Sequence, residues 1–229
     1  MKHGKAYRTA RESVDKDQEI GIAEALASLD AMPRPKFDET VDMAVRLSVN
    51  PRHADQNVRG TVVLPNGTGK SVRVLVITRG PKEQEATDAG ADMVGADEYL
   101  PKIKDGWTDV DVIIATPDMM GELGKLGRIL GPRGLMPNPK VGTVTMDIAK
   151  AVKEAKAGRI EYRVDKSGII HAPIGKRSFT VDALQENAQA LYRELIRVKP
   201  AAVKGTYVRS IFLSGTMTPS IRVDSASLA

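Results

Sequence analysis

The sequence predicts an α/β protein of two domains, in which a parallel α/β domain is inserted into an α+β domain built from both chain ends. Three observations predict this architecture: strand and helix patterns alternate in the middle of the chain, amphipathic strands and a long helix flank them, and glycine-rich joints separate the two patterns. We place the discontinuous domain at residues 1–67 and 159–229 and the inserted domain at residues 68–158.

The middle of the chain alternates between strand and helix patterns. β-branched runs at Ser71–Thr78 and Asp111–Thr116 predict strands, with the short apolar run Ala91–Val94 between them. A helix-compatible segment follows each run. The predicted helices are Lys82–Ala89, Asp97–Ile103 and Pro117–Leu130. Alternation at this spacing is typical of βαβ units and predicts a Rossmann-like parallel sheet.

Both ends of the chain show amphipathic patterns instead. Thr40–Val49 alternates apolar and polar residues, which predicts a half-buried strand. The turn-forming tetrad Asp165–Gly168 lies between two apolar-rich runs, Arg159–Val164 and Ile169–Ala172, and predicts a hairpin. The other predicted elements are the strands Val58–Leu64 and Thr206–Ser214 and the helix Val181–Val198. Together they predict a ferredoxin-like α+β sandwich.

The composition restricts the class of protein. The 229 residues include no cysteine, which excludes disulfides, thiolate metal sites and a cysteine nucleophile. No apolar stretch reaches the roughly 18 residues of a membrane span, and no apolar segment follows the basic N-terminus as in a secretory signal. We therefore expect a soluble, cytoplasmic protein without a membrane partner. The net charge of +5 suits a polyanionic partner, and residues 160–229 hold ten bases against six acids.

Enzyme motifs are incomplete. Asn66–Ser71 resembles part of a phosphate-binding loop, but position 64 is leucine where that motif needs glycine, and a strand rather than a helix is predicted to follow. The three histidines lie far apart, and the paired carboxylates Asp38–Glu39 and Asp109 with Asp111 fit a salt-linked turn and a strand edge better than acid–base chemistry. We predict no catalytic site, metal or cofactor. The alternatives are a nucleotide-binding enzyme that uses the inserted domain, and a DNA-binding repressor.

One loop, Gly131–Gly142, contains three prolines and three glycines and cannot form a helix or a central strand. Long ordered loops are often functional, and Arg133 and Lys140 would let this one bind phosphate. A tight crossover packed on Met136 explains the composition equally well.

Two further segments hold residue types that are used in RNA recognition. Arg34–Phe37 brings an aromatic ring next to basic residues, so the ring can stack on a base while the cations bind phosphates. A core anchor for the following strand is the alternative for Phe37. Ser214–Ser220 offers small and hydroxyl-bearing residues that permit close approach to a ribose 2′-OH, although ordinary turns use the same residues.

Four sequence blocks together resemble one family. They are Lys36–Asp42, Asp55–Val62, Gly131–Gly142 and Gly168–Lys176, and they resemble, in this order, the bacterial members of the ribosomal protein L1 family. The resemblance implies a non-enzymatic constituent of the large ribosomal subunit that binds 23S ribosomal RNA at the mobile stalk through the domain formed by both chain ends. It further implies help in releasing deacylated tRNA from the exit site, and translational repression by binding its own operon mRNA. We expect a monomer when the protein is free of the ribosome.

The resemblance also implies RNA-contact positions. The main contacts are Lys36, Phe37, Thr40, Lys166, Ser167, Gly168, Thr216, Met217 and Thr218; the supporting contacts are His3, Lys5 and Arg52; and the secondary contacts from the inserted domain are Arg133 and Lys140. The family usually has glycine where this chain has Thr218. Either the loop conformation tolerates the added Cβ, or RNA binding is weaker.

Overall fold

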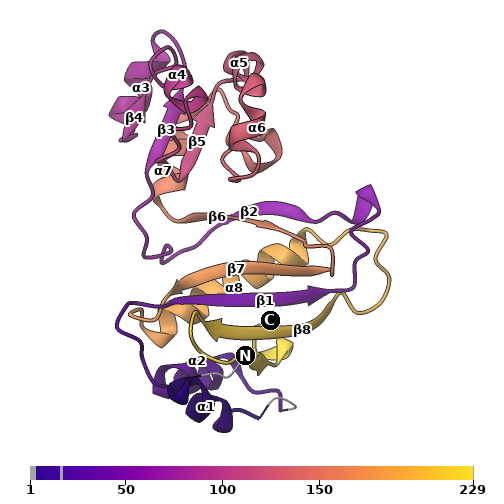
Figure 1. The fold of residues 1–229 in the computed structure, drawn as a ribbon. Coiled ribbons are helices and arrows are strands. Elements are labelled where there is room, and N and C mark those ends of the chain that lie inside the picture. The colour runs from indigo at the N-terminus through magenta and orange to yellow at the C-terminus, as the bar shows by residue number, and fades with distance from the viewer. Residues whose placement is uncertain (1–3, 16–17, 229) are drawn as a thin grey trace. The chain divides into compact units, whose positions relative to one another are not determined.

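The computed structural model describes residues 4–15 and 18–228, and the chain divides into two compact units (Figure 1). Unit 1 comprises residues 1–69 and 160–229, and unit 2 comprises residues 70–159. Each cluster of buried apolar side chains in the described chain belongs to one unit alone. Each unit is therefore organised around its own hydrophobic core.

Unit 1 is an α+β arrangement. Its helices are α1 (Lys5–Glu12), α2 (Ile22–Ala31) and α8 (Val181–Arg197), with the 3₁₀ turns η1 (Ala54–Gln56) and η4 (Ser225–Leu228). Its strands are β1 (Thr40–Leu47), β2 (Arg59–Val63), β6 (Arg159–Arg163), β7 (Ile169–Lys176), β8 (Val208–Gly215) and β9 (Ile221–Val223). Four strands form an antiparallel sheet in the order β7-β1-β8-β9, while β2 and β6 form a separate pair.

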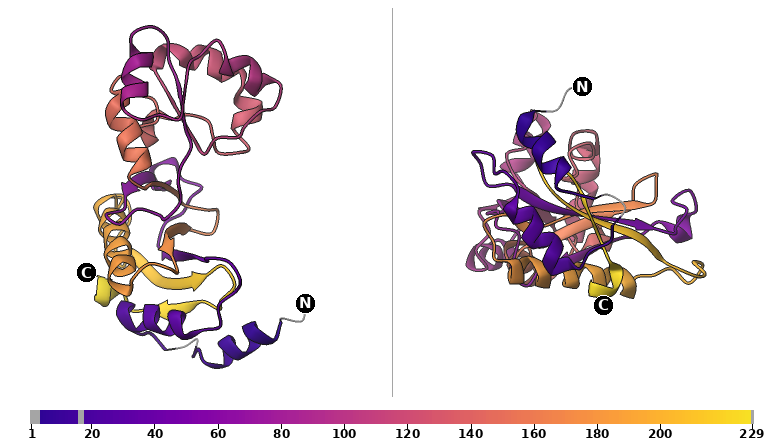
Figure 2. Two further views of the ribbon diagram at one scale, coloured as in Figure 1. Left: turned by 90° about the vertical axis from the view of Figure 1, so that its left-hand side faces the viewer. Right: turned by 90° about the horizontal axis from the view of Figure 1, so that it is seen from below.

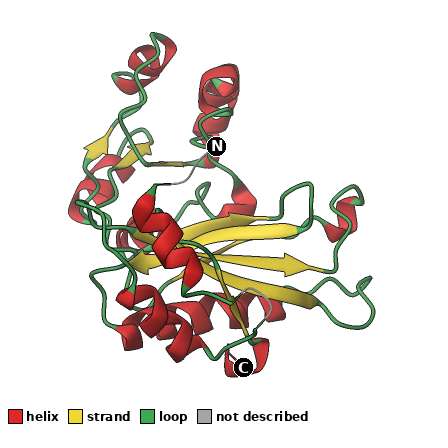
Figure 3. Cartoon of the chain, turned by 60° about the horizontal axis from the view of Figure 1, so that its bottom comes forward, coloured by secondary structure: helices red, strands yellow, loops and turns green. Residues whose placement is uncertain are grey.

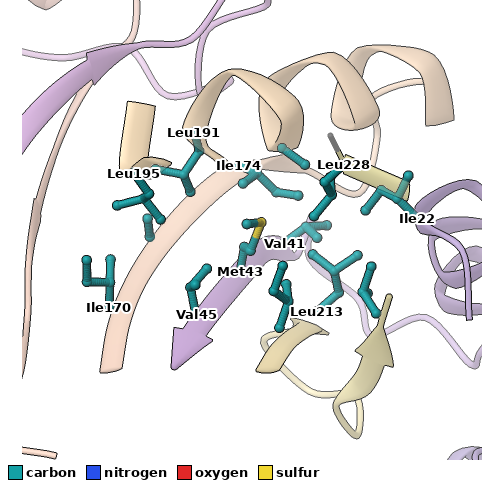
Figure 4. Packing of buried hydrophobic residues seen from close by; sticks show 14 of the residues in the cluster. Ile22, Val41, Met43, Val45, Ile170, Ile174, Leu191, Leu195, Leu213 and Leu228 are labelled. Carbon is teal, nitrogen blue, oxygen red and sulfur yellow. The ribbon is translucent and has the colours of Figure 1, made fainter. Parts of the chain in front are cut away.

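Strand β1 shows how the four-stranded sheet acquires one covered face. Its apolar residues Val41, Met43 and Val45 are fully buried, whereas Asp42 and Arg46 lie on the opposite face because side chains alternate along a strand. Helices α2 and α8 pack on the buried face (Figures 2 and 3). Figure 4 shows Leu191 and Leu195 of α8 near Met43, and Ile22 of α2 near Leu228 in the same apolar cluster. The alternation predicted for this strand is confirmed.

Helix α8 follows directly from its sequence. The hydroxyl of Thr180 caps the helix by accepting a hydrogen bond from a first-turn backbone N–H at 3.3 Å. Leu184, Ala188, Leu191 and Leu195 recur every three or four residues and are all buried, so one apolar stripe faces the sheet.

The hairpin predicted around Asp165–Gly168 forms only next to its turn, where the backbone N–H of Asp165 donates a hydrogen bond to the carbonyl oxygen of Ile169 at 2.8 Å, and it does not extend into a pair of strands. Strands β6 and β7 pair with β2 and β1, respectively, and in the described part of the chain a single bridge between Val164 and Ile170 joins the two segments. The tetrad is instead a tight turn that carries the chain from one sheet to the other. An alternating pattern specifies the faces of a strand but not its partner, which explains the difference.

Unit 2 is a three-layer α/β arrangement. Its strands β3 (Val74–Ile77), β4 (Met93–Val94) and β5 (Val112–Ala115) form a parallel sheet in the order β4-β3-β5. Its helices are α3 (Lys82–Asp88), α4 (Tyr99–Lys104), α5 (Met120–Lys125), α6 (Gly127–Leu130) and α7 (Ile148–Lys156), with the 3₁₀ turns η2 (Pro117–Met119) and η3 (Pro139–Val141). The predicted combination of an antiparallel α+β unit with a parallel α/β unit is confirmed.

The central strand of unit 2 is covered on both faces. Val74 and Val76 pack with α3 and α7, whereas Leu75 and Ile77 pack with α4, α5 and α6. All four side chains are buried, as in other parallel sheets with helices on both sides.

Three predicted elements of unit 2 differ from the structure. The strand expected from Ser71 begins at Val74, and the helix expected over Pro117–Leu130 is divided into η2, α5 and α6. Glycines at positions 121, 124 and 127 weaken a continuous helix there. The loop Gly131–Gly142 contains η3, in which the side chain of Asn138 accepts a hydrogen bond from the backbone N–H of Lys140 at 2.9 Å.

Candidate RNA-binding site

Two segments far apart in the sequence meet at one end of the four-stranded sheet. Strand β1 begins at Thr40 where β8 ends at Gly215, and Val41 pairs with Gly215. The backbone N–H of Thr216 donates a hydrogen bond to the carbonyl oxygen of Thr40 at 3.2 Å. The segment before Thr40 and the loop after Gly215 therefore lie side by side. Six of the predicted RNA contacts lie on these two segments, and we call them the Phe37 cluster: Lys36, Phe37, Thr40, Thr216, Met217 and Thr218.

Phe37 and Met217 are exposed apolar side chains within this cluster. Their exposed fractions are 54% and 59%. The alternative that Phe37 anchors the core is therefore wrong. Large apolar side chains held at the surface provide contact area for a partner, and an aromatic ring can stack on a nucleotide base.

Lysine and hydroxyl groups surround these apolar side chains. Lys36 is exposed, and the Nζ of Lys176 donates a hydrogen bond to the Thr40 hydroxyl at 3.0 Å. Sequence analysis did not select Lys176, although it ends the block Gly168–Lys176 and could have been found there. Asp38 accepts hydrogen bonds from the backbone N–H and the hydroxyl of Ser178, at 3.2 and 2.8 Å. Asp38 therefore braces a turn, and its partner is Ser178.

Thr218 fits its loop without strain. None of the described non-glycine residues has a positive φ, so the position does not require glycine. The Thr218 hydroxyl accepts a hydrogen bond from the backbone N–H of Gly215 at 2.7 Å, and its own backbone N–H donates to the Gly215 carbonyl oxygen at 3.3 Å. Of the two alternatives for this departure from the family pattern, the structure supports a tolerant loop conformation.

The turn Lys166–Gly168 lies at the opposite end of β1. The carbonyl oxygen of Gly168 accepts a hydrogen bond from the backbone N–H of Leu47 at 2.8 Å. Because β1 has 8 residues, this end is about 23 Å from Thr40. We call Lys166, Ser167 and Gly168 the Lys166 cluster; Arg52 lies on the segment that follows β1.

Asp165 holds this turn in shape. Its carboxylate accepts hydrogen bonds from the backbone N–H groups of Ile169 and Ser167, both at 2.8 Å. These bonds favour the charged form and hold the pKa of Asp165 below its usual value. Gly168 has a φ of +80°, which L side chains rarely adopt, so glycine is required there.

A half-exposed sheet surface lies between the two clusters. Side chains of β1, β7, β8 and β9 line a hollow of about 440 Å³: Ala44, Arg46, Ile169, His171, Arg209, Ser210, Phe212 and Arg222. Three of these are arginines; Arg222 is paired with Glu19 at 2.5 Å, so the positive charge of the surface comes mainly from Arg46 and Arg209. These residues could not be predicted as one surface, because alternation gives the direction of each side chain in its strand but not the register that brings the strands together. Burial raises the pKa of Asp42 on the same face, and electrostatic interaction with His171 and Lys176 opposes that rise.

The predicted supporting RNA contacts on the N-terminal segment are Lys5 and His3, and the structure describes Lys5. Lys5 is exposed on α1, and Tyr7 and Arg11 of this helix line a small hollow together with Pro219 and Ser220. Helix α1 therefore approaches the end of the loop that holds Met217. His3 lies outside the residues that the structure describes.

The secondary contacts lie in unit 2. The guanidinium of Arg133 donates a hydrogen bond to the Thr108 hydroxyl, and Lys140 is exposed in the middle of η3. Leu135 and Met136 pack against the core of unit 2, so the loop is also the packed crossover considered as its alternative. Packing and phosphate binding do not exclude each other here.

The described residues give little support to a metal site, a phosphate-binding loop or an acid–base pair. Within residues 4–15 and 18–228 no three His, Cys, Asp or Glu side chains gather to hold a metal ion. No helix of the described chain is long and apolar enough to cross a membrane. Asn66 does not open a helix; its backbone N–H donates to the side chain of the buried Asn187 on α8 at 3.0 Å, which ties down the segment that resembled a phosphate loop. Asp109 and Asp111 pair with Arg73 at the start of β3.

The two units define a class of protein: an α+β domain with a basic, partly apolar sheet surface, into which a parallel α/β domain is inserted. A model of the ribosomal protein L1p/L10e family matches residues 29–219. The chain is 60% identical over 220 residues to the large ribosomal subunit protein uL1 of Chlorobium luteolum, covering 96% of each chain. It is 59% identical to the protein of the same name from Chlorobaculum tepidum, covering 96% of this chain and 95% of that one. This chain belongs to the ribosomal protein L1p/L10e family, whose members are structural proteins of the ribosome and not enzymes.

Proposed function

We propose that this chain is a structural protein of the large ribosomal subunit that binds 23S ribosomal RNA of the mobile stalk through unit 1. Family membership and the names of the close relatives support the ribosomal part. The observation that carries the RNA-binding part is the hydrogen bond between Thr216 and Thr40, which brings the segments of the exposed Phe37 and Met217 to the same end of one sheet.

Each kind of residue has a distinct part in this proposal. Lys36 and Lys166 bind phosphates, which gives an affinity that falls with salt. The hydroxyls of Thr40, Ser167 and Thr216 contact sugar hydroxyls or base edges, which separates RNA from DNA. The apolar side chains of the Phe37 cluster stack on or pack against bases. The arginines of the sheet surface extend the contact from one cluster to the other.

The test is a filter-binding titration with a large-subunit stalk RNA fragment, a scrambled RNA of equal length and a DNA duplex. Tight binding to the stalk fragment alone supports the proposal. Equal binding to all three nucleic acids would show that only the positive charge of the chain had been detected, and the proposal would fail.

Two further roles are part of the proposal and rest on the resemblance of the motif blocks. At the cytoplasmic ribosome the protein helps to release deacylated tRNA from the exit site; ribosomes lacking it should release this tRNA more slowly and recover when it is added back. The free protein, a monomer, represses its own operon mRNA; adding it to a translation extract should lower synthesis from that message, and stalk RNA should restore synthesis. Failure of either assay removes that role and leaves the binding of stalk RNA standing.

A further inference from the structure

Beneath the Phe37 cluster lies a buried ion pair that none of the RNA-contact assignments includes. Glu39 is 1% exposed and Arg177 is 5% exposed. The Nη1 of Arg177 lies 3.5 Å from Oε1 of Glu39, and the backbone N–H of Arg177 donates to the Glu39 carbonyl oxygen at 2.9 Å. The pair therefore joins the segment before β1 to the end of β7.

Arg177 fixes the segment that leads to Phe37. Its Nη2 donates hydrogen bonds to the carbonyl oxygens of Leu29 at 2.8 Å and of Met32, and its Nη1 donates to that of Pro33 at 3.3 Å. The last carbonyl groups of a helix have no partner within the helix, and Arg177 supplies one at the end of α2. The chain then runs directly from these anchored residues into Lys36 and Phe37.

Glu39 faces the other half of the cluster. A Cβ added at Gly215 would overlap Oε2 of Glu39 and would lie 3.1 Å from the hydroxyl oxygen of Thr218. The Glu39 carboxylate is thus packed directly against the backbone from which the Thr216–Thr218 loop departs. This Oε2 is buried and accepts no hydrogen bond from any described residue.

A buried ion pair is a poor device for stability alone. The cost of removing both charges from water commonly equals or exceeds their attraction, so apolar side chains of similar volume often stabilise a fold as well. What such a pair does provide is a fixed geometry, because each charge holds the partners that satisfy it. Here Arg177 holds the carbonyl groups that precede Lys36, and the Glu39 carboxylate packs against Gly215, from which the Thr216–Thr218 loop departs.

We propose that Glu39 and Arg177 are positioning residues that hold the Lys36–Phe37 segment and the Thr216–Thr218 loop in one arrangement before RNA binds. The inference rests on the proposed function, since it concerns the geometry of that site. Loops fixed in their bound arrangement lose less conformational freedom on binding, and affinity rises without any new contact.

The decisive variant is Gly215→Ala, which displaces the loop or the carboxylate without removing a charge. The backbone of Gly215 does not need positive φ, so alanine is otherwise acceptable there. We expect the affinity for stalk RNA to fall at least about tenfold, while the slope of log affinity against log salt stays unchanged because the phosphate contacts remain. Lys36→Ala, by contrast, should lower that slope by about one.

A matched control separates an effect on the position of the loop from a general loss of stability. Gly60 of β2 lies in the same unit, and a Cβ there would meet the Tyr162 hydroxyl at 2.5 Å, far along the chain from the Phe37 cluster. Gly60→Ala should lower the melting temperature without changing RNA affinity. Equal losses of affinity in Gly60→Ala and Gly215→Ala would overturn the proposal.

Two further measurements complete the test: the affinity of a double variant and the hydrogen exchange of loop amides. In a Glu39→Ala background the carboxylate is gone, so adding Gly215→Ala should cost little further affinity; a full additional loss would contradict a direct contact. Hydrogen exchange of the Thr216 and Thr218 amides in the free protein should speed up in Gly215→Ala, and unchanged exchange together with unchanged affinity would refute the inference. If the wild-type chain binds no stalk RNA, the proposed function fails, and the exchange rates alone still decide whether the pair fixes the loop.

Discussion

Phe37 and Met217 are large apolar side chains that unit 1 leaves more than half exposed. Burying a side chain of this kind stabilises a fold by roughly 1.5–3 kcal/mol, so their exposure brings no benefit to folding. A partner that covers both side chains accounts for their position at one end of the sheet. Their contribution should then be visible in binding and absent from stability.

Phe37→Ala should weaken binding of stalk RNA by about 1–3 kcal/mol, the usual contribution of one base stacked on an aromatic ring. Met217→Ala should also weaken binding, through lost apolar contact, and both variants should leave the melting temperature nearly unchanged. Filter binding and thermal unfolding measure the two effects. Met146→Ala is the matched control, because Met146 is 55% exposed but lies in unit 2. A loss of affinity in Met146→Ala as large as in Met217→Ala would show that the assay reports exposed methionines in general.

Two buried tyrosines make the stability of unit 1 sensitive to alkali. Burial raises the pKa of Tyr162 and that of Tyr207 to about 12, and neither hydroxyl has a hydrogen-bond partner among the described residues. Because the folded-state pKa is raised, the stability from keeping these phenols neutral is fully present below about pH 10 and is lost as the pH rises toward 12.

Replacing both tyrosines, Tyr162→Phe with Tyr207→Phe, should therefore reduce the loss of stability between about pH 10 and 12. At pH 7 the double variant should be as stable as the wild type or more stable by up to about 1 kcal/mol, since no hydrogen bond to protein is lost. Urea unfolding at several pH values measures both effects. A single replacement should remove only part of the alkaline effect, and an unchanged alkaline curve in the double variant would contradict the assignment.

At the scale of elements, the turn Asp165–Gly168 depends on a single carboxylate. Hydrogen bonds from backbone N–H groups lower the pKa of Asp165. A lowered folded-state pKa means that this contribution to stability is present above the ordinary aspartate value of about 4 and is lost as the pH falls through the lower folded value.

Asp165→Ala should cost about 1–2 kcal/mol of unfolding free energy at pH 7 through the loss of two backbone hydrogen bonds. It should also weaken the binding of stalk RNA, because Lys166 and Ser167 lose their fixed position. Urea unfolding and filter binding are the measurements. Ser178→Ala removes one hydrogen bond, from the Ser178 hydroxyl to Asp38, at the opposite end of the sheet and serves as a comparison. A variant that keeps its stability at pH 7 would show that the carboxylate does not hold the turn.

The elements that the sequence predicted best are those whose pattern depends on local geometry. Strand Thr40–Leu47 and helix Val181–Arg197 follow from spacings of two and of three to four residues. The predicted hairpin does not extend beyond its turn because β6 pairs with β2, about a hundred residues earlier in the chain, and no local pattern specifies that partner. The same limit applies to the candidate site. Arg46, Arg209 and Arg222 meet only through strand register, and the buried Glu39 and Arg177 form a pair whose two members lie far apart in the sequence.

At the scale of the whole molecule, the glycine joints indicated where the chain changes from one pattern to the other. The expected joints at residues 67–68 and 158–159 lie within two residues of the ends of the compact units. Composition pointed only weakly to the unit that we propose binds RNA: residues 160–229 hold ten bases against six acids, but a mild excess of positive charge does not demand a nucleic-acid partner. The assignment of RNA binding to unit 1 came from the motif blocks. That each unit folds alone is a separate prediction.

We expect both units to fold independently, because their buried clusters share no residue in the described chain. Strands β2 and β6 pair, so the chain leaves and re-enters unit 1 from neighbouring strands, and a flexible linker of about six Gly and Ser residues should replace unit 2 at little entropic cost. The shortened chain should unfold cooperatively and bind stalk RNA within about threefold of the full protein, since the Phe37 and Lys166 clusters lie in unit 1. Residues 70–159 alone should fold and bind the RNA weakly, through Arg133 and Lys140. If unit 1 folds but loses most of its affinity, the contacts of unit 2 are primary, and the loop Gly131–Gly142 becomes the first place to substitute.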